Sequence, residues 1–141
     1  MRKLMAACAA LAALAAAPAG EAQSRAPIAG TWSGFYGYAG REETVEFQAR
    51  LSGAGAFTGA TVEPATFGDG SVLFLTANIR GNVAGDGGVH FTKTYDGSGG
   101  QTHSVQYDGK YDANGKCIVG EWSQGGGRGP FEMCTDAHLL F

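Results

Sequence analysis

The stretch that decides the fold is Ile28 to Tyr38, which reads Ile-Ala-Gly-Thr-Trp-Ser-Gly-Phe-Tyr-Gly-Tyr. In an extended strand alternate side chains share a face. One face then carries Ile28, Gly30, Trp32, Gly34, Tyr36 and Tyr38. Its Gly30-Thr31-Trp32 is echoed later in the chain by Gly120-Glu121-Trp122. We expect the two segments to lie near opposite ends of one closed β-barrel, each with a glycine that makes room for a core indole.

The rest of the chain repeats this alternation in short segments separated by glycine-rich turns, which is the pattern of an antiparallel sandwich or barrel. In residues 71–83 we expect Leu73, Leu75, Ala77, Ile79 and Val83 to point inward. In residues 89–95, Lys93 falls on the inward side with Phe91 and Tyr95. The expected strands are residues 28–38, 41–51, 56–63, 71–83, 89–95, 101–112, 116–124 and 129–135. The fold class is therefore all-β, an eight-stranded up-and-down antiparallel β-barrel, because closure removes the exposed edges of a sheet.

The last hairpin predicts a disulfide. A two-residue turn centred on Gly125-Gly126 suits the positive φ that such turns need. That register places Cys117 opposite Cys134 on the outer wall and puts Ile118 opposite Met133 on the inner face. A one-residue slip would separate the cysteines and turn the core face outward.

The two ends of the chain differ in composition from the middle. The layout of residues 1–22 is that of a secretory signal peptide. It begins with Arg2 and Lys3, continues with an apolar run over residues 4–17 and ends in small residues up to Ala22. Residues 23–27 are expected to form a flexible lead-in, residues 28–135 the barrel, and residues 136–141 an apolar tail. We therefore expect an exported protein, periplasmic or extracellular, in which a disulfide can persist.

Charge and motifs exclude several classes of function. The formal net charge is -3 and no cluster of Lys or Arg occurs, so neither nucleic acid nor an anionic membrane surface is an expected partner. We expect no membrane span, because the apolar run is shorter than about 20 residues. The three histidines have no metal-ligand spacing and no phosphate loop is present, so we expect no metal and no cofactor.

The motifs Gly30-Thr31-Trp32, Gly120-Glu121-Trp122 and the segments 107–112 and 129–133 carry a family resemblance. An exported eight-stranded meander with Gly-x-Trp in its first strand resembles the calycin superfamily, the lipocalins and avidins. The whole pattern is most similar to small exported bacterial barrels of uncharacterised function. The resemblance implies that Trp32 packs across one end of the barrel, with Trp122, Gly30 and Gly120 also structural. The chain departs from the avidins in lacking their polar residues after Trp32, so biotin is not an expected ligand.

We expect a non-catalytic protein whose role is binding, and three hypotheses from different classes remain. The first is binding of a small apolar or aromatic ligand inside the barrel, with candidate contacts Tyr36, Tyr38, Tyr95, His103 and Tyr107. The second is a filled barrel that acts as a protein–protein interaction or inhibitor module in the cell envelope. The third is an enzyme that uses His103 and a tyrosine as acid and base. The volume of the barrel interior decides between the first two; the oligomeric state and the ligand or partner are not encoded in any motif.

Overall fold

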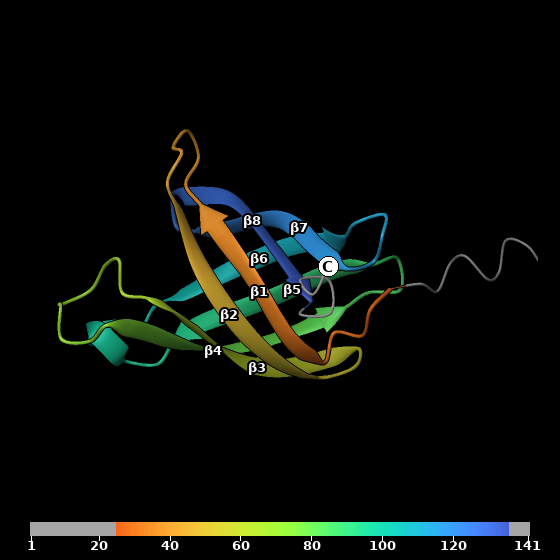
Figure 1. Cartoon of the computed structure of the whole chain (residues 1–141), viewed down its shortest axis with the longest axis horizontal. Coiled ribbons are helices and arrows are strands. Elements are labelled where there is room, and N and C mark those ends of the chain that lie inside the picture. The colour runs from red at the N-terminus through yellow and green to blue at the C-terminus, as the bar shows by residue number, and fades with distance from the viewer. Residues whose placement is uncertain (1–24, 136–141) are drawn as a thin grey trace, which may run out of the picture.

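The computed structural model describes residues 25–135, which form one closed barrel (Figure 1). The predicted signal peptide at 1–22 and the tail at 136–141 lie outside the described residues. The strands are β1 (Gly30–Gly37), β2 (Thr44–Gly53), β3 (Ala56–Pro64), β4 (Phe74–Val83), β5 (Gly88–Tyr95), β6 (Ser104–Tyr111), β7 (Cys117–Gln124) and β8 (Gly127–Thr135). A single 3-10 turn, Ser98–Gly100, lies between β5 and β6. Each strand pairs with its neighbours in sequence, and β8 pairs with β1. The predicted eight-stranded up-and-down barrel is confirmed.

One predicted strand boundary is wrong in a way that matters for the surface. The fourth strand begins at Phe74 rather than residue 71, so Leu73 precedes the strand and is 83% exposed instead of pointing inward. The inward alternation expected for Leu75, Ala77 and Ile79 is confirmed. The reason is the connection after Pro64, whose Asp69 accepts hydrogen bonds from the backbone N–H and hydroxyl of Ser71 and holds that segment in a turn.

Large side chains fill the barrel from end to end. Trp32 lies near the start of β1, and its indole N–H donates to the carbonyl oxygen of Ile28 at 2.8 Å. Trp122 lies at the opposite end and donates to the carbonyl oxygen of Gly37 at 2.7 Å. Between the two indoles the core contains Val45, Phe47, Leu51, Phe57, Leu75, Ile79, Phe91, Val105, Ile118, Phe131 and Met133. Each indole thus fills one end of the barrel and satisfies its only donor there.

The glycines near the tryptophans act differently from one another. Gly30 has φ of 134° and no heavy atom within 4 Å of a Cβ placed on it, so its role is conformational. A Cβ on Gly120 would lie 2.0 Å from the carbonyl oxygen of Asp108 on the neighbouring strand. A Cβ on Gly129 would lie 2.1 Å from the carbonyl oxygen of Gly37 and 2.7 Å from Nε1 of Trp122, so Gly129 makes room both for the backbone of residue 37 and for the indole that donates to it.

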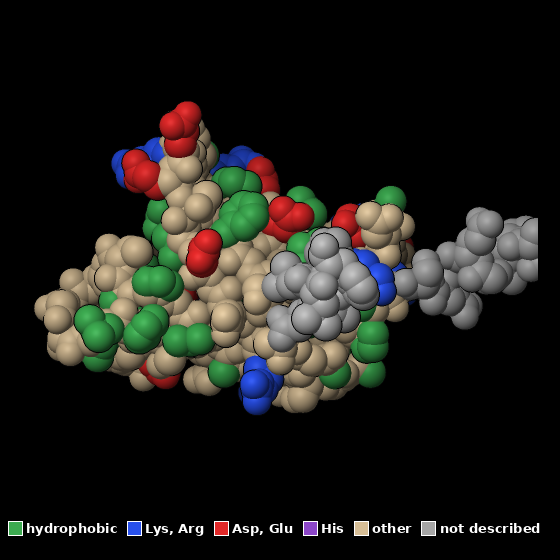
Figure 2. All heavy atoms as spheres, in the orientation of Figure 1, with side chains coloured by type: hydrophobic (Ala, Val, Ile, Leu, Met, Phe, Trp, Pro, Cys, Tyr) green, Lys and Arg blue, Asp and Glu red, His purple; other side chains and the backbone are tan. Residues whose placement is uncertain are grey.

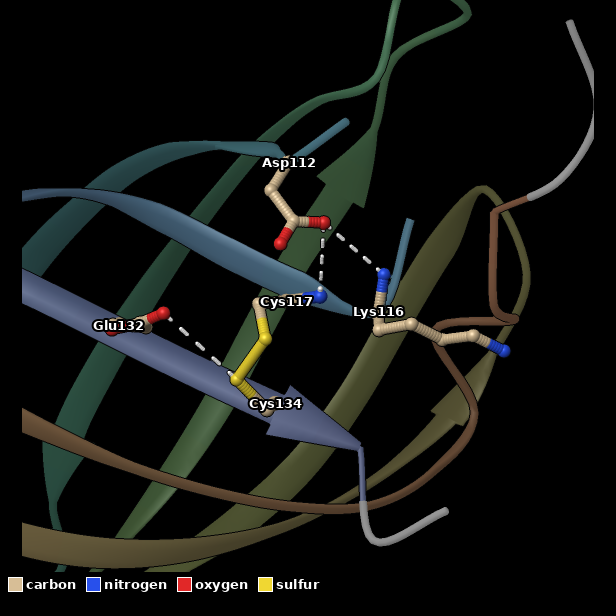
Figure 3. The surroundings of a disulfide bond; sticks show 5 residues. All are labelled: Asp112, Lys116, Cys117, Glu132 and Cys134. Carbon is tan, nitrogen blue, oxygen red and sulfur yellow. Dashed lines mark hydrogen bonds between the residues drawn. A yellow bond between two sulfur atoms is a disulfide. The ribbon is translucent and has the colours of Figure 1, made fainter. Parts of the chain in front are cut away.

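The predicted disulfide joins Cys117 of β7 to Cys134 of β8 (Figure 3). The two residues are directly opposed, as are Ile118 and Met133 and also Trp122 and Gly129, so the register expected from a Gly125-Gly126 turn is confirmed. Oδ1 of Asp112 accepts the backbone N–H groups of Lys116 and Cys117 at 3.2 and 3.4 Å and orders the turn that precedes the disulfide.

The barrel surface has two projections. The turn between β1 and β2 stands out from the wall, and so does the connection between β3 and β4; a saddle lies between them (Figure 2). The described end of the predicted lead-in does not leave the barrel. The N–H of Ala26 donates to the carbonyl oxygen of Gly115, and its own carbonyl oxygen accepts the hydroxyl of Tyr111. Within residues 25–135 no helix has the length and apolar character needed to cross a membrane.

Candidate functional site

The five side chains proposed as ligand contacts meet at one end of the barrel. Tyr36, Tyr38, Tyr95, His103 and Tyr107 all line a single cavity of about 50 Å³. The cavity lies at the Trp122 end, and its other lining residues are Phe67, Val105, Trp122 and Gln124. Phe67 comes from the β3–β4 connection and packs edge-on against Tyr95, with ring centroids 5.6 Å apart. We call this region the mouth.

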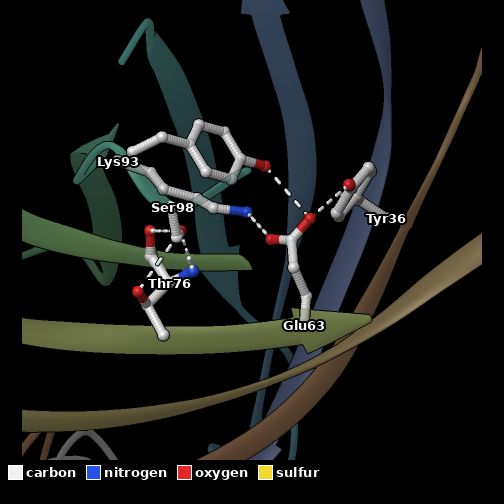
Figure 4. Close-up of polar contacts among 6 residues, drawn as sticks. Tyr36, Glu63, Thr76, Lys93 and Ser98 are labelled. Atoms are coloured by element: carbon white, nitrogen blue, oxygen red, sulfur yellow. Dashed lines mark hydrogen bonds and ion pairs between the residues drawn. The ribbon is translucent and has the colours of Figure 1, made fainter. Parts of the chain in front are cut away.

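Beneath the mouth, the barrel interior contains a buried ion pair between Glu63 of β3 and Lys93 of β5 (Figure 4). Their exposed fractions are 1% and 2%. The second carboxylate oxygen of Glu63 accepts the hydroxyl of Tyr36 at 2.7 Å and that of Tyr95 at 3.1 Å. Both carboxylate oxygens of Glu63 therefore have hydrogen-bond donors, three in all, and such partners compensate a carboxylate for the loss of water.

The ammonium group of Lys93 also faces aromatic rings. Its Nζ lies 4.7 Å from the ring centroid of Tyr95, 5.0 Å from that of Tyr36, and 5.8 and 5.9 Å from those of Phe47 and Tyr107. These distances are within the range of cation–π attraction. Burial lowers the pKa of Lys93, while the charge of Glu63 and its hydrogen bond act in the opposite direction.

The interior tyrosines are held in their neutral form. Burial is the largest cause that raises the pKa of Tyr36, Tyr95 and Tyr107, and the negative charge of Glu63 raises all three further. They therefore act as hydrogen-bond donors over the whole neutral pH range. Tyr36 and Tyr95 donate to Glu63, whereas the hydroxyl of Tyr107 has no hydrogen-bond partner among the described residues and faces the mouth.

His103 is placed by aromatic contacts. Its ring centroid lies 4.7 Å from that of Tyr95 and 6.0 Å from that of Phe67. Within the described part of the chain, its ring nitrogens make no hydrogen bond to a tyrosine or a carboxylate, so the acid–base arrangement considered from the sequence has no hydrogen-bonded pair here.

Glu63 was missed by the sequence reasoning, although a signal was present. The alternation that puts Phe57 and Thr61 inside also puts Glu63 inside, and Lys93 was already recognised as an inward charge. Two opposite charges on inward faces predict a buried pair, but only closure of the barrel shows that β3 and β5 bring them together.

A second hollow lies on the outer wall, in the saddle between the two projections (Figure 2). It has a volume of about 650 Å³ and is lined by residues of β8, β1, β2, β3 and β4. We call it the outer groove. Its apolar side chains are Phe35, Val62, Pro64 and Phe74, of which Phe74 is 56% exposed. Val72 and Leu73, which precede Phe74 in the chain, are exposed as well, so exposed apolar residues continue into the β3–β4 connection.

Carboxylates separate the apolar side chains of the outer groove. Phe35 of β1 pairs with Glu132 of β8 on one side and with Glu46 of β2 on the other. Continuing the β2–β3 register places Pro64 beside Glu46, and Pro64 pairs with Phe74. The row across the five strands therefore alternates between acidic and apolar residues before it ends in two apolar ones. Within residues 25–135, no Lys or Arg lines the groove.

Among the described residues, the one set of three side chains close enough to share a metal ion is Cys117, Glu132 and Cys134. The two cysteines form the disulfide, so neither sulfur offers a thiolate in this state.

Comparison of the chain with protein-family models, curated proteins and solved structures gave no match. The closed eight-stranded antiparallel barrel is compatible with a calycin-like fold. It is also compatible with either a ligand-binding or an interaction role, and the two hollows allow the choice to be argued from volume and chemistry.

Proposed function

We propose that the protein is a binding module that engages a partner protein through the outer groove. The observation that carries this proposal is the exposed apolar lining of the outer groove, combined with its volume. A hollow of equal volume elsewhere on the wall, about 650 Å³, is lined mainly by polar side chains such as Thr58, Asn78 and Arg80. Ligand pockets for drug-sized molecules have volumes of about 300–1,000 Å³. The mouth, at about 50 Å³, falls well below this range, and the outer groove, at about 650 Å³, lies within it.

The lining specifies the chemistry of the partner. Exposed Phe35, Val62 and Phe74 offer an apolar surface, which in water favours burial against a partner's apolar side chains. Glu46 and Glu132 beside Phe35 require cationic groups on the partner. A second copy that docked the same groove face to face would bring carboxylates against carboxylates, so the occupant is a different protein with a basic and apolar segment.

The test is selection from a random peptide library displayed on phage, with the purified protein as the bait. We expect enriched sequences that combine Lys or Arg with large apolar residues. Their binding should be lost in Phe35→Ser and Phe74→Ser. It should be retained in Thr58→Ala, the control, because Thr58 is exposed on β3 and does not line the groove. Enriched peptides that bind all three variants equally would reject the outer groove as the site.

The mouth supports a second candidate, binding of a small aromatic ligand, on a specific observation. Tyr36, Tyr38, Tyr95, His103 and Tyr107 converge there. Phe67 lines the same cavity and packs against Tyr95 and His103. The cavity has room for about two water molecules at roughly 30 Å³ each. A larger ligand therefore requires Phe67 to move out of the mouth.

This second candidate is tested with 4-fluorophenol, followed by its ¹⁹F signal. If the mouth is a ligand site closed by Phe67, Phe67→Ala should bind the probe more tightly than the unchanged protein. Adding Tyr107→Phe to Phe67→Ala should remove most of that gain, because the free hydroxyl of Tyr107 is the expected partner of the phenol. Native mass spectrometry of protein from its own host, with no co-purifying mass, would count against a resident ligand.

We also propose that the protein is exported and is a relative of the calycins. The Cys117–Cys134 disulfide supports export, because such bonds persist in oxidising compartments. The position of Trp32 across one end of the barrel supports the relationship. Cell fractionation with an antibody to the barrel tests the first point.

A further inference from the structure

We propose that the partner segment is an α-helix that lies across the strands, with Lys or Arg at positions i and i+7 and apolar residues at i+3 or i+4, i+10 or i+11, and i+14. This inference rests on the proposed function and specifies its partner. It comes from the row that crosses the outer groove in the order Glu132, Phe35, Glu46, Pro64, Phe74.

Closure of the barrel excludes the commonest way in which sheets bind peptides. An extended peptide adds to a sheet by pairing with a free edge strand. Here every strand has two partners, because β8 pairs with β1 over Trp32 to Tyr36. Recognition must therefore use side chains on the outer face, and a helix laid in an apolar groove is the regular structure that presents side chains without needing backbone partners.

The spacing of the row matches the spacing of helical turns. Neighbouring strands lie about 4.8 Å apart, so Glu132 and Glu46, two strands apart, are separated by about 9.6 Å. Seven residues of helix advance about 10.5 Å, and successive turns about 5.4 Å. Phe35 lies between the two glutamates and faces the turn between the two basic residues. Over the four intervals to Phe74, fourteen residues of helix advance about 21.0 Å against about 19.2 Å for the strands, a mismatch of about 1.8 Å, which is about the length of one C–C bond.

The surroundings fix where such a helix ends. The β3–β4 connection projects beyond Phe74, and its exposed Val72 and Leu73 adjoin the apolar end of the row. The acidic end of the row is at Glu132, beside the disulfide. The basic end of the helix therefore lies over β8, and the apolar end lies against the connection.

The test uses a fluorescent 18-residue peptide of alanine and glutamine that carries Lys at i and i+7 and Leu at i+3, i+10 and i+14. Binding to the full barrel is followed by anisotropy. A register control keeps two Lys and three Leu but places Lys at i+3 and i+10 and Leu at i, i+7 and i+14. A second control carries a central proline, which breaks the helix. We expect both controls to bind at least ~10-fold more weakly, since each loses one or more central contacts.

Variants of the protein distinguish a failure of the helix proposal from a failure of the groove proposal. Phe35→Ser should weaken binding of the designed peptide about 10-fold. Thr58→Ala should leave binding unchanged, because Thr58 is exposed on β3 and does not line the groove. Glu46→Lys should weaken binding, and a peptide with Glu in place of Lys at i+7 should restore it. If the register and proline controls bind as well as the designed peptide while Phe35→Ser still weakens all of them, the helix is overturned and the groove stands.

Loss of all dependence on Phe35 would overturn both the helix and the groove. The last experiment removes residues 136–141 and measures peptide binding again. Unchanged affinity supports an external partner, whereas a 10-fold gain would make the tail of this chain the occupant and overturn the proposal.

Discussion

Glu63→Gln is the sharpest probe of the barrel interior, because it removes one charge and little else. Glutamine keeps an oxygen that can accept the hydroxyls of Tyr36 and Tyr95. Lys93, which is 2% exposed, then has no counter-ion. It must either remain charged in an apolar setting, at a cost of several kcal/mol, or release its proton when the chain folds.

Release of the proton sets the upper limit of the loss in stability. An unperturbed lysine has a pKa of about 10.4, so its deprotonation at pH 7 costs about 4.6 kcal/mol and at pH 9 about 1.9 kcal/mol. In the variant, the unfolded chain binds one more proton than the native state. The free energy of unfolding should therefore rise by about 1.4 kcal/mol per pH unit between pH 7 and 9.

The measurement is urea denaturation at pH 7, 8 and 9, followed by tryptophan fluorescence. The matched control is Glu121→Gln, whose partner Arg128 is exposed, and its cost should stay below ~1 kcal/mol. Adding Lys93→Met to Glu63→Gln should recover most of the loss, because no buried charge remains. A Glu63→Gln protein within ~1 kcal/mol of the unchanged protein at pH 7, with no dependence on pH, would refute the assignment of a dry, paired lysine.

Three further outcomes are expected. Above pH 10 the free energy of unfolding should fall by up to ~4 kcal/mol per pH unit, because only the unfolded chain releases the protons of Tyr36, Tyr95 and Tyr107. Urea denaturation between pH 9 and 11 measures this slope, and a free energy that does not change with pH would contradict the burial of these tyrosines. Alkylation and mass measurement should find no free thiol at Cys117 or Cys134 before reduction, and replacing both cysteines by alanine should cost ~3 kcal/mol. Gly129→Ala should destabilise by ~1–3 kcal/mol and perturb Trp122 fluorescence, since its methyl group would lie 2.1 Å from the carbonyl oxygen of Gly37 and 2.7 Å from the indole nitrogen that donates to it; Gly126→Ala, with open space, is the control.

Period-two alternation was enough to predict the eight strands, their inward faces and the pairing of the last hairpin. These are local properties, because a turn with glycine at its centre fixes the register of the strands that flank it. The boundary at Leu73 was missed because an Asp–Ser turn ended the pattern without a change in hydrophobicity. The five proposed mouth residues were chosen by face alone, and the structure places all five around one cavity.

The sequence by itself determined the barrel, the disulfide and the identity of the inward side chains, since each follows from the spacing of residues along the chain. Only the tertiary structure decided that the cavity at the mouth is small, about 50 Å³. Interior volume is what remains after side chains from eight strands have packed together, so no single strand encodes it. The same holds for the meeting of Glu63 with Lys93 and for the row from Glu132 to Phe74. Both depend on how strands separated in sequence are staggered around a closed wall.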